Sequence, residues 1–273
     1  MTTLVNGQAS TNLQVADRGL QYGDGLFETL ALRNGDPLLW DRHIQRLGDG
    51  CRRLGLPAPE ASLLREEVTR IAESEARAVA KIILTRGTAG RGYRVDASGT
   101  VTRIVQHLPW PAYPDAAGKE GVTVRWCETR LARQPRLAGM KHLNRLEQVL
   151  ARAEWQDDYA EGLMCDTDGL VIEGTMTNLF LVRADGTVVT PDLSQSGVAG
   201  VMRAQVLDSA AAMGMNCIIQ AVTTDMVESA QELFLTNSLI GIWPIRRIEA
   251  RHYVVGKISQ TLQAALHTAG FLA

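Results

Sequence analysis

Residues 139–150 read GMKHLNRLEQVL and place a lone lysine, Lys141, directly before apolar residues at helical spacing. Further along, residues 173–180 read EGTMTNLF, so that Glu173 precedes small polar residues and an apolar strand pattern. A lysine amine can condense with an aldehyde, and a carboxylate can keep a pyridine nitrogen protonated. Together the two residues predict a site for pyridoxal phosphate (PLP). Taken singly, they are also compatible with a solvated surface lysine and with a polar residue at a strand end.

A phosphate-bearing cofactor also needs an anion site, and three features of the sequence could supply one. Residues 196–203, SGVAGVMR, form a glycine-bearing turn that enters a predicted helix, and helix N-termini bind phosphate through their N–H groups. Ser238 offers a hydroxyl after a predicted strand, and Arg46 projects from the predicted helix 41–54 as a charged donor. An ordinary loop before a helix and an exposed helix arginine are the alternatives.

Composition limits the classes of function. The 273 residues carry 28 Lys and Arg against 30 Asp and Glu, so there is no basic excess to indicate nucleic-acid binding. No run of about 18 apolar residues predicts a membrane span, and the first residues lack a signal-peptide pattern. The cysteines show no C-x-x-C spacing, which argues against a zinc site or a disulfide framework and favours a reducing cytoplasm. They are Cys51, Cys127, Cys165 and Cys217.

The first part of the chain is predicted to be an α+β domain over residues 1–108. Asn-Gly pairs at 6–7 and 34–35 lie between apolar runs and favour tight hairpin turns. Apolar spacing predicts helices at 41–54 and 60–75 and strands at 79–84 and 100–108. The proline-rich residues 109–114, PWPAYP, stiffen the chain, so we expect an interdomain connector over 109–120.

The remainder, 121–273, is predicted to be a larger domain of short strands with few crossovers. A largely antiparallel, barrel-like arrangement suits that pattern. An apolar helical face is expected around residues 143–153. Strands are predicted at 122–127, 161–166, 170–173, 178–183, 187–190, 216–220 and 232–236, and helices at 201–213 and 257–269.

Taken together, these segments resemble the fold-type IV PLP enzymes, a family of branched-chain aminotransferases, D-amino acid aminotransferases and aminodeoxychorismate lyases. The resemblance covers nearly the whole chain. Residues 17–28, DRGLQYGDGLFE, are similar to the family's N-terminal glycine motif, and residues 43–47, HIQRL, to its phosphate-arginine helix. The resemblance implies two domains, a smaller N-terminal α/β sandwich and a larger C-terminal barrel, with PLP as cofactor.

The resemblance also implies a role for each candidate residue. Lys141 stands where the family's lysine joins the cofactor and moves the proton, and Glu173 stands where a carboxylate meets the pyridine nitrogen. Asn178 is a separate candidate, as partner of the cofactor's phenolic oxygen, because that contact does not carry over from the branched-chain enzymes, whose tyrosine is Leu146 here. Phosphate contacts are implied for Arg46, Ser238 and the backbone amides of Gly200, Val201 and Met202. Arg91 and Tyr93 lie in a Gly-rich loop and are candidates for binding a substrate carboxylate, although that loop could equally be a flexible hairpin tip.

Within the family, the stretches at 141–149 and 86–93 resemble the lyases. The branched-chain enzymes usually carry a tyrosine five residues after the lysine, where this chain has Leu146. The resemblance therefore implies conversion of 4-amino-4-deoxychorismate to 4-aminobenzoate and pyruvate. A D-amino acid or branched-chain aminotransferase is the nearest alternative. A catalytically silent, dimer-forming binding protein is the alternative from another class.

As partners, the resemblance implies a small-molecule substrate and a second copy of the chain in a homodimer. Tyr113 or the loop 86–93 could reach toward that second copy. Neither a metal, nor nucleic acid, nor a membrane is expected as a ligand.

Overall fold

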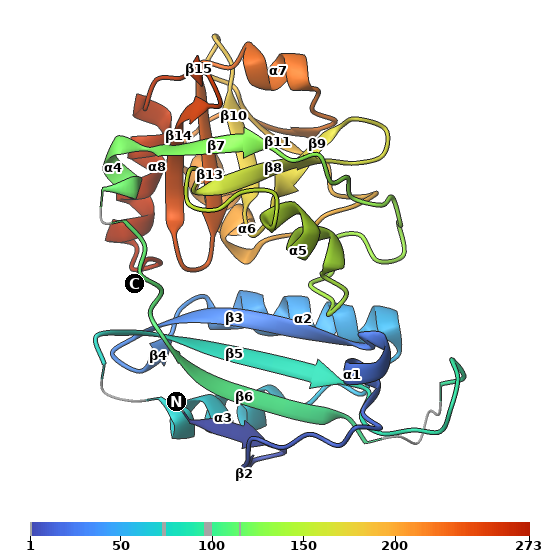
Figure 1. Ribbon diagram of the computed structural model, residues 1–273. Helices are drawn as coiled ribbons and strands as arrows, with labels where there is room; N and C mark the ends of the chain where they lie inside the picture. The colour runs from blue at the N-terminus through green and yellow to red at the C-terminus, as the bar shows by residue number, and fades with distance from the viewer. Residues whose placement is uncertain (1, 73–74, 96–99, 115) are drawn as a thin grey trace. The chain divides into compact units, whose positions relative to one another are not determined.

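The computed structural model describes residues 2–72, 75–95, 100–114 and 116–273. Positions 73–74 of the second predicted helix and position 115 of the predicted connector lie outside the described residues. The chain forms two compact units. The first contains Met1–Pro111 together with Met140–Asn144 and Ala273, and the second contains Ala112–Gly139 and Arg145–Leu272 (Figure 1). The segment that bears Lys141 therefore belongs with the first unit, although the sequence around it continues into the second.

The first unit is built on a six-stranded sheet in which every neighbouring pair is antiparallel. Its order is β2-β1-β6-β5-β3-β4. Both Asn-Gly pairs form the hairpin turns predicted for them, because asparagine and glycine each adopt positive φ at 6–7 and at 34–35. The strands are β1 (Thr3–Val5), β2 (Gln8–Ala9), β3 (Gly25–Arg33), β4 (Asp36–Pro37), β5 (Arg77–Thr85) and β6 (Thr102–Pro109).

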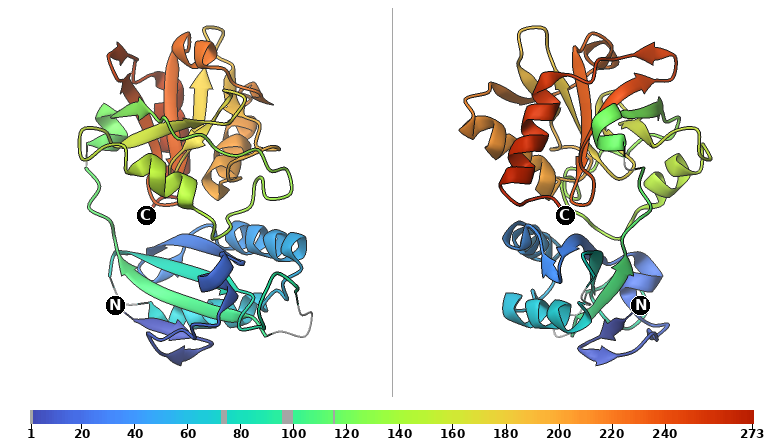
Figure 2. Two further views of the ribbon diagram at one scale, coloured as in Figure 1. Left: turned by 45° about the vertical axis from the view of Figure 1, so that its right-hand side comes forward. Right: turned by 90° about the vertical axis from the view of Figure 1, so that its left-hand side faces the viewer.

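Two helices cover one face of this sheet. Helix α2 (Trp40–Leu54) contacts β3, and α3 (Ala61–Ile71) contacts β6 and β1. The right-hand view of Figure 2 shows both helices on the same side of the strands. Apolar residues spaced three and four apart, such as Leu64 and Val68, are buried and exclude water from the interface. This two-layer arrangement confirms the predicted sandwich-like N-terminal fold. A short helix, α1 (Arg18–Tyr22), precedes β3.

The second unit is organised around a closed ring of six strands. Its order is β10-β13-β14-β7-β8-β9, and β9 pairs back with β10. Antiparallel pairs predominate, with parallel pairing where β7 meets β14 and β8. The barrel-like prediction is thus confirmed. The strands are β7 (Val122–Trp126), β8 (Glu161–Cys165), β9 (Val171–Gly174), β10 (Asn178–Val182), β13 (Glu232–Asn237) and β14 (Gly241–Ile248), with β11 (Val188–Pro191), β12 (Cys217–Gln220) and β15 (Arg251–His252) outside the ring.

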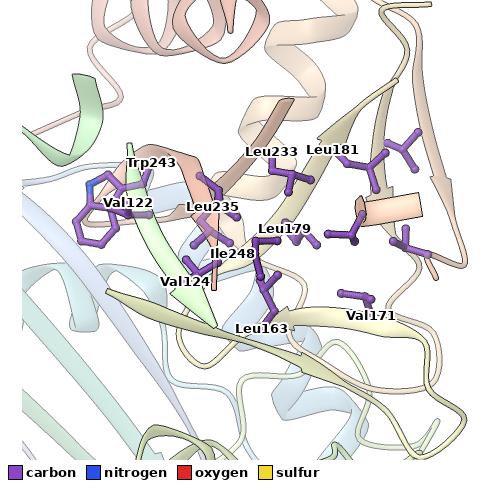
Figure 3. Packing of buried hydrophobic residues seen from close by; sticks show 14 of the residues in the cluster. Val122, Val124, Leu163, Val171, Leu179, Leu181, Leu233, Leu235, Trp243 and Ile248 are labelled. Atoms are coloured by element: carbon purple, nitrogen blue, oxygen red, sulfur yellow. The ribbon is translucent and has the colours of Figure 1, made fainter. Parts of the chain in front are cut away.

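One apolar cluster joins the strands of this ring. Leu163 of β8, Leu179 of β10 and Leu235 of β13 are fully buried within it, and Val124 of β7 packs against them (Figure 3). Within each of these strands, members of the cluster are two positions apart. One face of each strand therefore points to a common core. The alternate positions face the other way and are available to build a site.

Glu173 faces away from this core because β9 carries one extra residue. Met164 is opposite Glu173, but the next residue of β8, Cys165, is opposite Val171, so that Ile172 has no counterpart. Val171 belongs to the core cluster, whereas Ile172 packs with Met164 in a second cluster. A β-bulge re-aims the side chains beyond it. Glu173 therefore shares its face with Met164.

Five helices complete the second unit, and four of its elements, including the short strand β15, were not predicted. Strand β14 contains Pro244, a residue that argues against a central strand. The short helices α4 and α7 were also missed. The helices are α4 (Ala117–Glu120), α5 (Leu146–Arg152), α6 (Val201–Ala212), α7 (Thr224–Glu228) and α8 (Lys257–Thr268). Among the described residues, none of the helices has the length and apolar character needed to cross a bilayer.

Candidate active site

Lys141 lies in an extended segment that runs along β3, five residues before α5 begins. The Phe27 N–H donates to the Lys141 carbonyl at 2.9 Å, and the Leu143 N–H donates to the Gly25 carbonyl at 3.0 Å. His142 makes an antiparallel bridge to Leu26 between these two bonds. The lysine backbone is thus fixed to the sheet by paired hydrogen bonds, which suits a residue whose side chain must be aimed reproducibly.

The Lys141 ammonium lies over an aromatic ring. Its Nζ is 4.4 Å from the centroid of the Phe27 ring, and the Nζ of Lys81 is 5.6 Å from the same centroid. Side chains of Phe27 and Lys81 are half-buried, as is that of Lys141. A lysine becomes a nucleophile or base only when its neutral form is accessible.

The residue after Phe27 anchors a buried charge cluster on α2. The Glu28 carboxylate is fully buried. Its Oε2 lies 2.6 Å from His43 Nδ1 and 2.5 Å from Arg46 Nη2, and its Oε1 accepts from Arg46 Nε at 2.8 Å. Burial by itself would raise the pKa of Glu28, but the charge and hydrogen bonds of Arg46 and His43 lower it to about 2. The Arg46 guanidinium is therefore fixed by Glu28. It is not the exposed helix arginine of the alternative interpretation.

His43 links this cluster electrostatically to the lysine. Burial lowers the pKa of His43, the Glu28 carboxylate opposes that effect, and the positive charges of Arg46 and Lys141 lower the pKa further. His43 Nε2 is buried with no hydrogen-bond partner among the described residues. The imidazole is thus neutral and donates from Nδ1 to the Glu28 carboxylate. Lys141 and Arg46 are brought into one neighbourhood of the first unit.

In the second unit, Glu173 and Asn178 are brought together. They are directly opposite each other in the pairing of β9 with β10, so both side chains lie on one face of the sheet. Glu173 Oε2 accepts from the Val198 N–H at 2.8 Å and lies 3.4 Å from Asn178 Nδ2. Asn178 Nδ2 also donates to the Val198 carbonyl at 2.8 Å. The carboxylate is thus fixed between a strand and the loop before α6.

That loop delivers the N-terminus of α6 to the same place. A Cβ on Gly200 would be 2.0 Å from Asn178 Oδ1, so only glycine permits this approach. Gly200 is the N-cap, and no side chain of the described residues caps the helix. The first N–H groups, including those of Val201 and Met202, lack the intrahelical acceptors that interior N–H groups have. A helix end of this kind binds phosphate.

The other candidates lie on loops. Ser238 is in the turn between β13 and β14, which Asn237 Oδ1 closes by accepting from the N–H groups of Leu239 and Ile240. Arg91 is exposed, and Tyr93 is 84% exposed with its ring edge-on to Tyr22. Among the described residues, neither side chain has a carboxylate partner.

The loop of residues 86–93 is nevertheless attached to the sheet through buried charges. Asp24 accepts from the guanidinium groups of Arg18 and Arg86 at 2.9 and 2.7 Å. The same Arg18 guanidinium also donates, through Nη1, to the Gly92 carbonyl at 2.8 Å. Burial raises the pKa of Asp24, and the two arginines outweigh it and lower the pKa overall. The loop is therefore anchored at Gly92 and is not simply a free hairpin tip.

The functional groups of these residues are of the types that bind PLP. The anchored Glu173 carboxylate suits a protonated pyridine nitrogen, and the α6 N-terminus and the held Arg46 suit a phosphate. Lys141 offers the amine. In the described part of the chain, no group of three or more His, Cys, Asp or Glu residues could hold a metal ion. Each unit thus carries groups of the kind that PLP chemistry uses: the amine and a guanidinium in the first unit, and the carboxylate and the helix N-terminus in the second.

Sequence reasoning missed three residues that support the site. Glu28 was seen only as the end of a glycine motif, and His43 only as part of the arginine helix. Glu161 of β8 was not noticed at all. Each is a charged or titratable residue with 0% exposure. Charged residues inside apolar strand or helix patterns were the available signal, because burial of such groups requires partners.

Comparison with known proteins places these observations in context. The family model for class IV amino-transferases matches residues 25–248. The chain is 36% identical over 269 residues to an aminodeoxychorismate lyase of Vibrio harveyi, covering 97% of this chain and 99% of that protein. It is 27% identical to a D-alanine aminotransferase of Bacillus licheniformis, covering 97% and 96% respectively.

A solved structure is also similar throughout. The crystal structure of 4-amino-4-deoxychorismate lyase from Pseudomonas aeruginosa superposes with a TM-score of 0.93 at 49% sequence identity. The match covers 97% of this chain and 98% of that one. The similarity therefore includes both units.

Proposed function

Since this chain belongs to the class IV aminotransferase family, we propose that it is a PLP-dependent aminodeoxychorismate lyase, which converts 4-amino-4-deoxychorismate to 4-aminobenzoate and pyruvate. The observation that carries the proposal is the near full-length identity of 36% and 49% to two proteins of that name, against 27% to the D-alanine aminotransferase. The held lysine and the anchored carboxylate supply the chemistry that the reaction requires.

When bound, PLP supplies an electron sink for the negative charge that forms as a proton leaves the substrate carbon bearing nitrogen. In the proposal, Lys141 takes that proton at Nζ and can return it to the departing enolpyruvate. Glu173 holds the ring nitrogen protonated, and Val198 holds Glu173 in place. Loss of pyruvate leaves an aromatic ring, so the reaction needs no second substrate. An aminotransferase, in contrast, must bind an oxo acid.

The binding roles are part of the same proposal. Arg46, Ser238 and the backbone amides of Gly200, Val201 and Met202 hold the phosphate. Asn178 stays a candidate for the cofactor's phenolic oxygen, although its Nδ2 is already used by Val198. Arg91 and Tyr93 are proposed to meet a substrate carboxylate, an assignment that depends on the family resemblance.

We also propose that the enzyme is a cytoplasmic homodimer. Its cysteines are free thiols, three of them buried, which suits a reducing compartment. The dimer is supported by an exposed apolar face on α5. Leu146 is 76% exposed, and Val149 and Leu150 are each 60% exposed. Adjacent exposed leucines and valines mark interaction surfaces.

One assay tests the proposed function directly. The purified protein is incubated with PLP and with chorismate, ammonia and an aminodeoxychorismate synthase, and 4-aminobenzoate is measured. A lyase releases 4-aminobenzoate and pyruvate in equal amounts without an added oxo acid. A parallel incubation with D-alanine or a branched-chain amino acid plus 2-oxoglutarate should yield little glutamate. Efficient glutamate formation without 4-aminobenzoate would establish the aminotransferase alternative instead.

A further inference from the structure

Glu161 of β8 is a buried carboxylate that the proposed chemistry does not use. It has no exposed surface, and an ionised group in the interior is tolerated only when hydrogen bonds replace its water. Its Oε1 accepts from the N–H groups of Gly162 at 2.9 Å and Thr175 at 3.0 Å and from the Thr175 hydroxyl. Its Oε2 accepts from the Met176 N–H and the Thr177 hydroxyl, both at 3.0 Å.

All of these donors except the Gly162 N–H belong to the turn that joins Glu173 to Asn178. Three consecutive residues, Thr175 to Thr177, all bind this one side chain. The turn is closed by the Gly174 N–H, which donates to the Thr177 carbonyl at 2.8 Å. A Cβ on Gly174 would lie 2.2 Å from Thr177 Oγ1 and 3.0 Å from Glu161 Cδ. The turn and the Glu161 side chain are therefore closely packed at this glycine.

The turn determines where the Glu173 carboxylate stands. Glu173 ends the bulged part of β9, and its opposite residue Asn178 begins β10. The bulge and the turn both lack regular ladder hydrogen bonds, so a side chain must supply what the backbone does not. We propose that Glu161 is a positioning residue, whose carboxylate holds the 174–177 turn and thereby fixes Glu173 at the place where it meets the cofactor's ring nitrogen. This inference rests on the proposed function.

The ionised form of the Glu161 carboxylate is the one that fits its hydrogen-bond donors. Burial raises the pKa of Glu161 above its ordinary value, and the hydrogen bonds from Thr175, Gly162, Met176 and Thr177 offset only part of that rise. The ionised form is assigned from the geometry, because every one of these contacts is a donor to the carboxylate. A glutamine at this position cannot reproduce the contacts. Backbone N–H groups point at both oxygens, so either orientation of the amide directs its NH2 group at a donor. Glu161→Gln therefore disturbs the turn while changing neither the volume of the side chain nor its position in β8.

The test compares this variant with a matched control in the PLP-loaded enzyme. Glu232→Gln alters another buried carboxylate of the same unit, which accepts from the N–H groups of Ile258 and Ser259 at the start of α8. Three properties are measured for each variant. They are the visible spectrum of the bound cofactor as a function of pH, the kinetic constants kcat and KM, and the Tm. Thr177→Val, which removes one hydroxyl donor at nearly constant volume, provides a milder change.

For Glu161→Gln we expect a loss in kcat of roughly tenfold or more and a displaced pH midpoint of the cofactor spectrum, with a small change in KM. Thr177→Val should shift both in the same direction by less. Glu232→Gln should lower Tm but leave the spectrum and kcat unchanged. If Glu161→Gln does not fold, Thr177→Val decides the question alone.

An unchanged spectrum in a folded Glu161→Gln or Thr177→Val enzyme, or equal spectral changes in Glu232→Gln, would overturn the positioning role. The spectrum requires cofactor but no substrate. Failure of the inference is therefore separable from failure of the proposed function, in which the wild type binds PLP normally but releases no 4-aminobenzoate.

Discussion

At the scale of single residues, two lysines near one aromatic ring provide a sharp test of which amine joins the cofactor. Lys141 and Lys81 both lie over the Phe27 ring, at 4.4 and 5.6 Å from its centroid. The Lys141 carbonyl accepts from the Phe27 N–H, whereas Lys81 lies in β5 opposite Thr29 of β3. Because the nucleophile must also move the proton, Lys141→Ala should lower 4-aminobenzoate release by at least about a thousandfold.

The covalent readout distinguishes the two lysines without using turnover. PLP fixed to the protein by borohydride should appear by mass spectrometry on the peptide containing Lys141 in the wild type and in Lys81→Ala. The Lys141→Ala enzyme should carry no such label, and Lys81→Ala should keep most of its activity. A label on the Lys81 peptide would transfer the catalytic assignment to that residue.

The lowered pKa of Glu28 predicts how the stability of the fold changes in acid. Its folded pKa of about 2 lies below the ordinary value of 4.5, so ionised Glu28 stabilises the fold above pH 4.5. That stabilisation, about 3 kcal/mol from the pKa difference, is lost as the pH falls from 4.5 through about 2. Glu28→Gln should therefore be less stable than the wild type at pH 7, and the gap should narrow in acid.

Urea unfolding at several pH values measures this gap. Glu60→Gln is the control, because Glu60 is exposed and its side chain does not cap α3. That variant should follow the wild-type curve at every pH. A gap for Glu28→Gln that persists unchanged at pH 2 would show that the carboxylate charge is not what stabilises the cluster.

At the scale of elements, the approach of α6 to β10 depends on one glycine. An added Cβ at Gly200 would be 2.0 Å from Asn178 Oδ1, so Gly200→Ala must displace either the amide or the helix start. Since Asn178 and Glu173 both bind Val198, the displacement should also loosen the carboxylate. We expect PLP affinity, measured by fluorescence titration of the apoenzyme, to fall by roughly tenfold or more.

The control for this substitution is Gly48→Ala in α2. Nothing lies within 4 Å of a Cβ built on Gly48. Alanine is the better helix former, so this variant should gain about 1 kcal/mol of stability and bind PLP as before. Equal PLP affinity in Gly200→Ala and the wild type would mean that the α6 N-terminus does not hold the phosphate.

The elements also show how far the sequence could predict the molecule. Helices α2, α6 and α8 begin within one residue of their predicted starts, because their apolar periodicity and flanking glycines are local signals. The face on which Glu173 lies follows from a bulge at Ile172, and strand β14 persists through Pro244. Neither has a local signature, since both depend on which strand lies alongside.

The supporting residues of the site were hidden for the same reason. The sequence identifies Lys141, Arg46 and Glu173 as candidates by residue type and by family resemblance. It does not reveal that Glu28 holds Arg46 or that Glu161 holds the turn after Glu173, because each contact joins residues distant in the chain. Such partners can be read only once the strands are in register.

At the scale of the whole molecule, the proposed machinery is divided between two units with separate cores. Lys141 and Arg46 belong to the first, and Glu173 and Gly200 belong to the second. The chain passes between the units after Pro111, after Gly139 and after Asn144. The short segment 140–144 therefore attaches the lysine to one unit while α5, which follows it directly, belongs to the other.

The exposed face of α5 carries the last prediction, which concerns assembly. Leu146, Val149 and Leu150 are at least 60% exposed, although three such apolar residues within two helical turns are costly in water. A second copy of the chain would cover them, so the wild type should sediment as a dimer. Replacing Val149 and Leu150 together by lysine places charges in the apolar contact and should shift the protein to monomer.

Met213→Lys is the matched control, because Met213 is also an exposed apolar residue of the second unit, 44% exposed at the end of α6. Sedimentation velocity over a hundredfold range of concentration should show a dimer for this variant and for the wild type. If the double α5 variant also remains a dimer, the interface lies elsewhere. If the wild type is itself a monomer at all concentrations, the proposed assembly is wrong, while the Lys141 and Glu173 chemistry stays testable in the monomer.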